Sequence, residues 1–454
     1  MNRLSVKSKL CYAVGDSCLT ITCVMVSVLY ALFMTDVAGL TPTMAAVAIF
    51  VGRSWDYLVD PLLGYITNKT KTRWGTYRPW LMFCSIPMGL AFGMMWWIPP
   101  FTSKGALTAY YAITYFIFVA FYSMLEIPYG SLTPRLTDSY NERTSLTSYR
   151  ILFSISGQLI AFLIPLTLLS LISPENPGIV LKAGLLAGGA SAVLMLFTAF
   201  GTREVVEPPE DTEEKITIVE SLRAAIKNPP LLFTIAMYTL TITGFEVTNS
   251  MMMYFFSYSL QVREGIANVM TAYFGISLLT IPLWNKLAQY KNKNFAYIVS
   301  LSGMIICRLV MMCLPVGVSP LTVWIIMGCT GFFFSGAQSL PWAIIPDSLE
   351  YDEYTTGQRH EGVFYALMAT VRGAFVSLVL PLTLIIMEQC GYVANQDVQT
   401  ASSALAIRLL FGGLPILFFA ITIILNKKYP MSRAQFEKIK TELAARHQTT
   451  NHES

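Results

Sequence analysis

The chain has 454 residues, of which 54% are hydrophobic and 13% are charged, and its formal net charge is +4 at pH 7. A composition this apolar excludes a soluble globular protein of this length. It predicts an all-α, multi-pass membrane protein whose partner is the lipid bilayer. The net charge is too small to indicate nucleic-acid binding, and the sequence has no basic patch with interleaved aromatic residues.

Roughly twelve apolar runs are long enough to cross a bilayer as helices, which takes about 20 residues each. The first set lies near residues 10–34, 41–66, 79–99, 106–133, 148–172 and 181–201. The second set lies near residues 230–259, 265–288, 294–315, 320–346, 362–387 and 404–427. A charged, proline-containing segment separates the two sets. The predicted domains are an N-terminal six-helix half at 1–205, a cytoplasmic linker at 206–228, a C-terminal six-helix half at 229–430 and a cytoplasmic tail at 431–454.

Lysine and arginine gather in the loops on the same side as the N-terminus. These residues are Lys69, Lys71, Arg73, Arg78, Arg135, Arg143, Lys286, Lys291, Lys293 and Arg359. The opposite loops hold Lys104, Lys182 and Arg263. Because positive loops stay in the cytoplasm, both termini are predicted to be cytoplasmic. The first apolar run is longer than the apolar part of a signal peptide, so we interpret it as the first span.

Cysteine and histidine give no sign of a metal or catalytic centre. Most of the 8 cysteines lie in apolar runs, and the 3 histidines are His360, His447 and His452. We therefore expect neither a histidine-based zinc site nor a cofactor. The sequence also lacks a recognisable nucleophile–base pair and a phosphate-cradling loop. A membrane-embedded enzyme and an ATP-driven pump are thus the least favoured alternatives.

The stretch 51–80 carries Arg53, Asp56 and Asp60 inside an apolar run. Asp56 and Asp60 are four residues apart, so on a helix both carboxylates point the same way. Ionisable groups at membrane depth are costly and usually line a path filled by water or substrate. The pair therefore predicts a cation site. The alternatives are a purely structural role for the two acids and a structural ion pair in which Arg53 holds Asp56.

Further ionisable residues fall within predicted spans. They are Asp16, Glu126, Arg150, Glu246 and Arg372. Each would cost about 2.5–3.5 kcal/mol if isolated in hydrocarbon, so we expect most of them to face a shared polar cavity. Carboxylates would outnumber guanidinium groups there, which leaves room for a bound cation or proton. Two alternatives stay open: Arg150 could reach the membrane interface from its helix end, and for Glu246, which has no evident partner, we favour a structural role.

Aromatic residues stand close to several of these acids in the sequence. They are Trp55, Tyr57, Tyr122 and Tyr129, and Trp342 lies in the tenth predicted span. Aromatic faces beside carboxylates and arginines suit sugars, because the C–H faces of a sugar stack on rings and its hydroxyls take hydrogen bonds. Tyr122 and Trp342 are therefore candidates for substrate binding. For any single ring, packing in the core or against lipid is the alternative.

Several motifs along the whole chain resemble one transporter family. The motifs are GDS at Gly15–Ser17, TDVAGL at Thr35–Leu40, RSWDYLVDPLLG at Arg53–Gly64, TRWGTYRPW at Thr72–Trp80, EIPYGSL at Glu126–Leu132 and PDSLEYDEYTTGQRHEGVFYAL at Pro346–Leu367. Together they resemble the glycoside–pentoside–hexuronide:cation symporters, the melibiose-permease-like branch of the major facilitator superfamily. The resemblance implies a monomer in a bacterial inner membrane, with twelve helices in two halves that rock around a central site.

The resemblance also implies roles for particular residues. The cation site would be Asp56 and Asp60, joined by the hydroxyl of Ser123. The substrate-binding positions that match are Asp16, Tyr122, Glu126, Arg150 and Arg372. No metal is implied beyond a possible Na⁺ at the two aspartates. The cation would bind first and neutralise the excess negative charge, and this would arrange the substrate site. The RWGTYRP turn would pack between helices and hold the inward gate.

This sequence departs from the family pattern at several positions. Val59 stands where melibiose permease has an asparagine that contributes to the cation site. Hard cations need several oxygen ligands, so we favour H⁺ over Na⁺. Gly130 replaces a tryptophan that packs on the sugar, and Gly15 replaces a lysine, so the pocket should be roomier and melibiose is not the expected substrate. Arg150 and Arg372 could bind the carboxylate of a sugar acid bidentately.

The sequence therefore predicts a secondary symporter of a sugar, glycoside or sugar acid, coupled to H⁺ or Na⁺. The alternative on the same fold is a symporter of a lysolipid or another amphiphile, because sodium-dependent lysolipid symporters resemble this family. The methionine-rich run Met251–Met253 is a mild indication of that second function.

Overall fold

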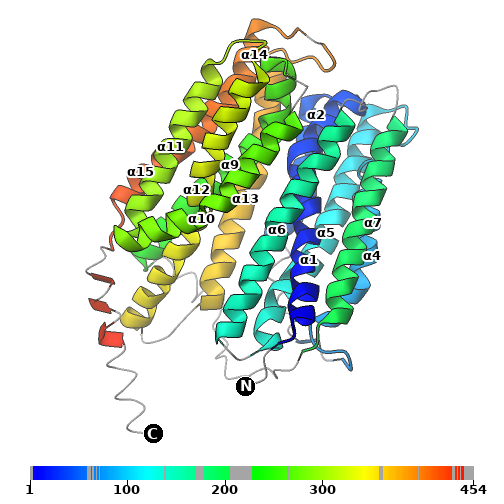
Figure 1. The fold of residues 1–454 in the computed structure, drawn as a ribbon. Coiled ribbons are helices and arrows are strands. Elements are labelled where there is room, and N and C mark those ends of the chain that lie inside the picture. Colours follow the sequence, from blue (N-terminus) through cyan, green and yellow to red (C-terminus); the bar gives the residue numbers. More distant parts are fainter. Residues whose placement is uncertain are drawn as a thin grey trace.

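The computed structural model describes the chain at residues 4–58, 63, 66, 67, 69, 70, 72–137, 140–169, 177–204, 227–262, 266–356, 361–396, 398–431, 435, 436, 438, 439 and 441–443. Helices make up most of this part of the chain, and no β-strand is found in it (Figure 1). Each predicted span overlaps a helix or a run of helices, so the predicted all-α membrane fold is confirmed.

The N-terminal helices form one bundle, here called the N-bundle. Its members are α1 (Val6–Met25) with the π-helical turns η1 (Val26–Tyr30) and η2 (Phe33–Val37), α2 (Pro42–Leu58), α4 (Arg78–Met94), α5 (Lys104–Leu136), α6 (Tyr140–Leu169) and α7 (Pro177–Gly201). Helix α1 packs against α6 and α7, and α4 packs against α5 and α7. Helix α1 is therefore covered by its own bundle on two sides.

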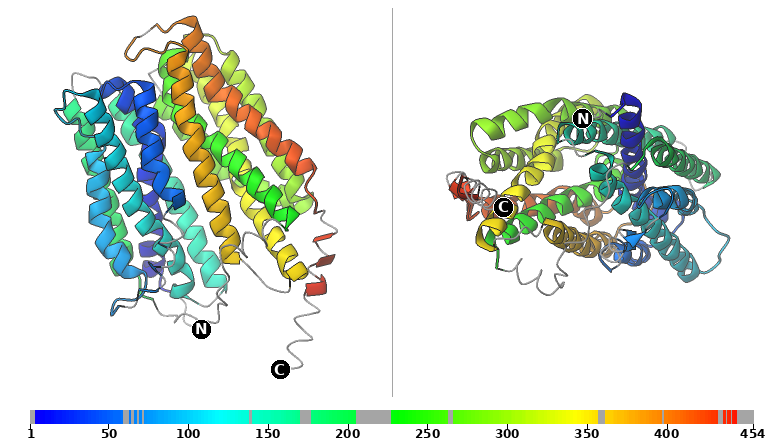
Figure 2. Two further views of the ribbon diagram at one scale, coloured as in Figure 1. Left: turned by 180° about the vertical axis from the view of Figure 1, so that it is seen from behind. Right: turned by 90° about the horizontal axis from the view of Figure 1, so that it is seen from below.

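The C-terminal helices form a second bundle, here called the C-bundle (Figures 1 and 2). Its members are α9 (Pro229–Tyr254) with η3 (Phe255–Leu260), α10 (Ile266–Tyr290), α11 (Lys293–Cys313), α12 (Pro320–Thr356), α13 (Glu361–Gln389), α14 (Ala401–Arg408) with η4 (Leu409–Gly413), and α15 (Leu414–Lys427). The predicted linker falls mostly on residues outside the described part, so the predicted domain boundaries stay predictions.

The described helices have the lengths and compositions that a bilayer requires. In the described part of the chain, 8 helical segments are each long and apolar enough to span a membrane. Helix α2 is not one of them, because its continuous described part ends at Leu58 and is 17 residues long. Side-chain caps begin some of the helices: the Asn228 side chain accepts a hydrogen bond from the backbone N–H of Leu231, and Asn292 caps α11 in the same way.

The two bundles touch along two pairs of helices. Helix α13 packs along α2, and α10 packs against α6. The turn η1 at the end of α1 also contacts α9. The central helices α1 and α9 therefore meet where the bundles face one another, and residues on them are placed to line any space between the bundles.

A cluster of polar side chains joins the bundles where η2 of the N-bundle meets η3 and the segment after α13. We call it the Asp36 cluster; its members are Thr35, Asp36, Tyr254, Tyr258, Tyr392 and Asn395. The Asp36 carboxylate accepts hydrogen bonds from the Tyr392 hydroxyl at 2.7 Å and from the Tyr258 hydroxyl. The Asn395 amide donates to the Asp36 backbone carbonyl at 2.7 Å. Asp36 lies in η2 of the N-bundle, whereas these partners belong to the C-bundle.

Thr35 extends this connection between the bundles. Its hydroxyl lies 2.9 Å from the Tyr254 hydroxyl and donates to the Asp36 carboxylate at 2.7 Å. Burial raises the pKa of the Tyr392 phenol, so this group stays a hydrogen-bond donor at physiological pH. Nearby, the backbone N–H of Thr43 at the start of α2 donates to the Glu388 carboxylate of α13 at 2.5 Å. This end of the interface is thus closed by several hydrogen bonds.

The basic turn before α4 is held inside the N-bundle. The Glu204 carboxylate accepts hydrogen bonds from the backbone N–H groups of Thr76, Tyr77 and Arg78, at 2.8–3.1 Å. The Arg78 side chain donates to the carbonyl of Ala199 at 2.8 Å. These contacts fix the turn on the end of α7. The expectation that the turn holds the inward gate stays a prediction.

Candidate functional site

A cavity of about 110 Å³ lies between the two bundles. Its described lining consists of Cys23, Val26, Ser27, Arg53, Tyr115, Phe118, Val119, Tyr122, Glu126, Glu246 and Arg372. The N-bundle contributes Arg53 and Glu126, and the C-bundle contributes Glu246 and Arg372. Each bundle therefore brings one guanidinium group and one carboxylate to the same small space. Charges grouped in this way are far less costly at membrane depth than isolated ones.

Helical spacing explains how α5 lines the cavity. Tyr115, Phe118, Tyr122 and Glu126 follow one another at intervals of three or four residues, so they share one face of the helix. Ser123, next to this face, is 1% exposed and packs inside the N-bundle. The sequence thus turns the aromatic and acidic side of α5 towards the cavity, while Ser123 is buried.

A π-helical turn contributes another part of the cavity lining. Ser27 lies in η1, and its hydroxyl donates to the Glu246 carboxylate of α9 at 3.0 Å. A π-turn adds a residue to a helical turn and is often found at functional sites, because it redirects the side chains that follow. Here the turn is the part of the α1 run that contacts α9. The Ser27–Glu246 hydrogen bond therefore connects the two bundles inside the cavity.

Asp16 and Arg150 form a second charged group within the N-bundle. The Arg150 Nη2 atom lies 3.0 Å from the Asp16 Oδ1 atom. The Arg150 guanidinium also lies 4.9 Å from the centroid of the Tyr129 ring and 5.9 Å from that of Tyr12, and these two rings stack on each other. Such stacking favours a guanidinium over an ammonium group. Arg150 is thus directed at Asp16 and two aromatic rings.

The predicted cation site cannot be placed completely. Asp56 lies in α2, but its side chain is outside the described part of the chain, and so is the whole of Asp60. Arg53, one turn before Asp56, lines the cavity from the same helix. The cation site at Asp56, Asp60 and Ser123, and the structural pairing of Arg53 with Asp56, therefore stay predictions.

Only some of the predicted substrate-binding residues belong to the described lining of the cavity. Tyr122, Glu126 and Arg372 line the cavity. Trp342 lies on α12, is 49% exposed and packs edge-on against Tyr238 of α9, with 5.3 Å between the ring centroids. The described lining of the cavity does not include Trp342. Substrate binding by all these residues stays a prediction.

The sequence does not indicate which way Glu246 faces. A carboxylate in mid-span without an evident partner favours a structural role, and that role stays a prediction. The structure places Glu246 in the cavity, against Ser27. The sequence around it carries a signal for this position, because small polar residues surround Glu246 in α9 (TLTITGFEVTNS). A helix with small polar residues on several faces is typical of one that packs inside a bundle rather than against lipid.

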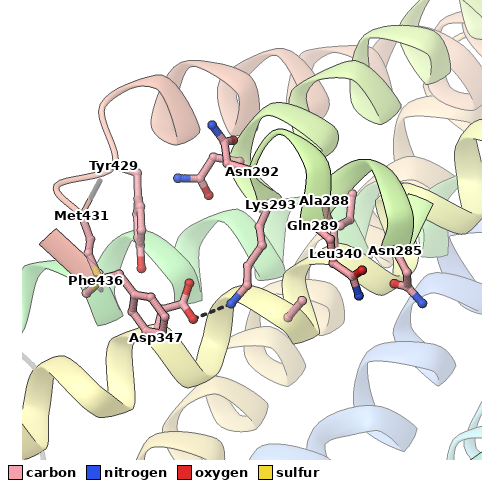
Figure 3. Close-up of a pocket in the computed structure, with 12 residues that line it drawn as sticks. Asn285, Ala288, Gln289, Asn292, Lys293, Leu340, Asp347, Tyr429, Met431 and Phe436 are labelled. Carbon is pink, nitrogen blue, oxygen red and sulfur yellow. Dashed lines mark hydrogen bonds and ion pairs between the residues drawn. The ribbon is translucent and has the colours of Figure 1, made fainter. Parts of the chain in front are cut away.

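A larger cavity, of about 510 Å³, lies at one end of the C-bundle (Figure 3). Its side chains include Asn285, Gln289 and Asn292, together with an ion pair of 2.6 Å between Lys293 and Asp347. The described lining of this cavity belongs to the C-bundle and the segment after α15. A path that opens alternately to the two sides must run between the bundles. The smaller cavity is therefore the candidate transport site.

Comparison with known proteins shows the family to which this chain is similar. A family model described as MFS/sugar transport protein matches residues 11–433. The chain is 28% identical to the uncharacterized symporter YnaJ of Bacillus subtilis, over 98% of this chain and 96% of that protein. It is 26% identical to the inner membrane symporter YicJ of Escherichia coli, over 94% of this chain and 92% of that protein.

Two further proteins are similar to most of this chain. The chain is 25% identical to the sodium-dependent lysophosphatidylcholine symporter 1-A of Danio rerio, over 96% of this chain and 87% of that protein. Among solved structures, the nucleoside transporter NupG has a TM-score of 0.62 and 13% sequence identity, and the match covers 92% of this chain and 99% of that chain. The second similarity supports the fold alone.

Proposed function

Because this chain belongs to the MFS/sugar transport protein family, we propose that it is a secondary symporter of a sugar, glycoside or sugar acid, with H⁺ favoured over Na⁺ as the coupling cation. The protein is a multi-pass membrane transporter and not an enzyme. The similarity to an inner membrane symporter supports a location in a bacterial inner membrane. Cytoplasmic termini and a monomeric state are part of this proposal.

The mixed-charge cavity between the bundles is the observation that carries this proposal. Sugar hydroxyls both donate and accept hydrogen bonds, so they can bind carboxylates such as Glu126 and guanidinium groups such as Arg372 in one site. Tyr122 adds an aromatic ring for the C–H face of the sugar. A cavity of about 110 Å³ is smaller than typical ligand sites of roughly 300–1,000 Å³. Binding therefore requires the bundles to move apart, as rocking would do.

In this mechanism the cation and the substrate stabilise the same rare state of the carrier. A cation at Asp56 and Asp60 reduces the excess of negative charge on the N-bundle side of the cavity. Asp16, held by Arg150, and Glu126 then bind substrate hydroxyls, and Arg372 binds from the C-bundle. Coupling follows because the two ligands together favour a conformation that neither favours alone.

A lysolipid is the second candidate substrate. Similarity over most of the chain to a protein named as a lysophosphatidylcholine symporter favours it. A cavity with both arginines and glutamates would also suit the two charges of such a headgroup. The volume of the cavity does not separate the two candidates, because either substrate requires the bundles to move apart.

Ligand-dependent thermal stability of the purified protein separates these two functions. We expect a neutral glycoside or a uronate from a substrate panel to raise the unfolding temperature by several degrees, because a ligand that binds the folded state stabilises it by mass action. The same compound should enter proteoliposomes in a saturable way. Arg372→Ala should lose the shift, whereas Lys293→Ala, in the larger cavity, should keep it. A shift given by lysolipids and by no sugar would contradict the proposed substrate class.

A further inference from the structure

Glu246 occupies a special position in α9. This helix packs against α12, α13 and α15 of its own bundle and against η1 of the N-bundle. Most of its residues between Thr239 and Tyr254 are buried, whereas Glu246 is partly accessible and lines the cavity. Because neighbouring helices cover α9 on most sides, the accessible part of Glu246 faces the cavity rather than lipid.

The carboxylate of Glu246 has an uncharged hydrogen-bond partner. The Ser27 hydroxyl donates to Glu246 Oε2 at 3.0 Å, and no ion pair of Glu246 within 4.0 Å is found among the described residues. A buried carboxylate is stabilised either by a nearby cation or by taking up a proton. A serine hydroxyl can donate to a carboxylate and can also accept from a carboxylic acid, so this contact suits either form of the side chain.

Other charged and titratable groups face this carboxylate across the cavity. Arg53 of α2 and Arg372 of α13 supply positive charge, Glu126 of α5 supplies negative charge, and Cys23 and Tyr122 complete the polar lining. The described lining thus holds two guanidinium groups and two carboxylates, and its charges balance when both acids are ionised.

We propose that Glu246 is a second coupling carboxylate, which binds the transported proton in the cavity and releases it when the bundles change position. This inference rests on the proposed symport function. Its geometry is specific, because Glu246 belongs to the C-bundle and Ser27 to the N-bundle. Rocking of the bundles therefore makes or breaks the hydrogen bond that stabilises the charged carboxylate. The proton comes from water on one side of the membrane, binds a carboxylate oxygen and leaves to water on the other side.

This arrangement adds to the predicted cation site on α2. Glu246 and Ser27 belong to different bundles, so rocking changes the distance between them. Glu246 gains or loses its Ser27 donor in that motion. The proton affinity of Glu246 is therefore tied directly to the conformation, which is the condition for coupling a proton gradient to transport.

Transport by Glu246→Gln in proteoliposomes tests this inference, because glutamine has a similar shape and cannot take up the proton. Two assays are compared: accumulation driven by a pH gradient, and counterflow, which exchanges substrate across the membrane without net proton movement. We expect accumulation to fall by tenfold or more and counterflow by no more than about threefold. Ser27→Ala should shift the pH optimum of accumulation. The matched control Glu442→Gln, on the tail segment where Glu442 pairs with Lys438, should behave as the wild type.

Several results would overturn the inference. Undiminished accumulation by Glu246→Gln would show that the carboxylate carries no coupling proton. An equal loss of accumulation and counterflow in a folded Glu246→Gln protein would make Glu246 a substrate ligand or a structural residue. If the wild type accumulates substrate under a sodium gradient but not under a pH gradient, the proton role fails while symport stands. If the wild type moves no substrate of the proposed class in either assay, the proposed function itself fails.

Discussion

Replacing Arg150 with alanine is expected to weaken substrate binding by about tenfold to a hundredfold. Arg150 holds Asp16 through an ion pair of 3.0 Å, and its guanidinium lies over the ring of Tyr129. Hydrogen bonds to charged groups contribute about 1.5–3 kcal/mol, and each 1.4 kcal/mol is a factor of about ten in affinity. The alanine variant would lose the guanidinium as a ligand and leave Asp16 without its partner. Substrate affinity measured by calorimetry or by the KM of counterflow checks the expectation.

Two further variants separate the effect of the Arg150 charge on substrate affinity from the effect of its planar shape. Arg150→Lys keeps the positive charge but loses the planar group that stacks on Tyr129 and Tyr12, so we expect an intermediate affinity. Asp16→Asn combined with Arg150→Ala should cost less than the sum of the two single changes, because the two residues act as one unit. Additive effects, or an Arg150→Ala protein with wild-type affinity, would mean that the pair has no part in substrate binding.

Replacing Asp36 with asparagine is expected to open the end of the interface that the Asp36 cluster closes. The Asp36 carboxylate accepts hydrogen bonds from Tyr258, Tyr392 and Thr35. An amide has one acceptor oxygen, so at least one tyrosine of the C-bundle loses its partner. About 1.5–3 kcal/mol per hydrogen bond to a charged group corresponds to a population shift of roughly tenfold or more towards the open state.

Cys23 is a built-in reporter for this shift, because it lines the cavity between the bundles. In right-side-out vesicles, with the other cysteines replaced, we expect a membrane-impermeant maleimide to label Cys23 about tenfold faster in Asp36→Asn than in the wild type. Tyr392→Phe should have a smaller effect in the same direction. Asp347→Asn, which removes the partner of Lys293 at the other end of the C-bundle, is the control. Equal labelling rates in Asp36→Asn and the wild type would contradict a gating role for the cluster.

The helices could be predicted from the sequence because hydropathy follows directly from residue type. A run such as that of α15 has to be buried in lipid or protein wherever it lies in the chain. Most of the charged residues that line the cavity could also be predicted, since an ionisable side chain within a span needs a polar space. The sequence does not show which of these side chains lie next to one another. Ser27 and Glu246 are 219 positions apart, and Asp36 and Tyr392 are 356 positions apart, so their pairing depends on how the bundles pack.

Two local features could not be predicted from the sequence. The π-helical turn η1 has no recognisable pattern in VSVLY, yet it sets the direction of Ser27. Arg308 of α11 lies within a predicted span but did not attract notice; it is 2% exposed, and its guanidinium lies 4.7 Å from the centroid of the Phe411 ring. Both depend on packing between helices, because neighbouring side chains rather than local residue type decide which face is buried. Trp342 packs against Tyr238, and its part in substrate binding stays a prediction.

Gradient-driven uptake by Asp56→Asn and Asp60→Asn in proteoliposomes is the measurement that tests the central claim most directly, with pH and sodium gradients imposed separately. If a cation bound at these acids drives transport, the wild type accumulates substrate above the outside concentration under the pH gradient. Each variant then equilibrates or exchanges substrate without accumulating it, and Asp347→Asn behaves as the wild type. Full accumulation by both aspartate variants, or wild-type uptake that responds to neither gradient, would contradict a cation-coupled symporter built on this helix.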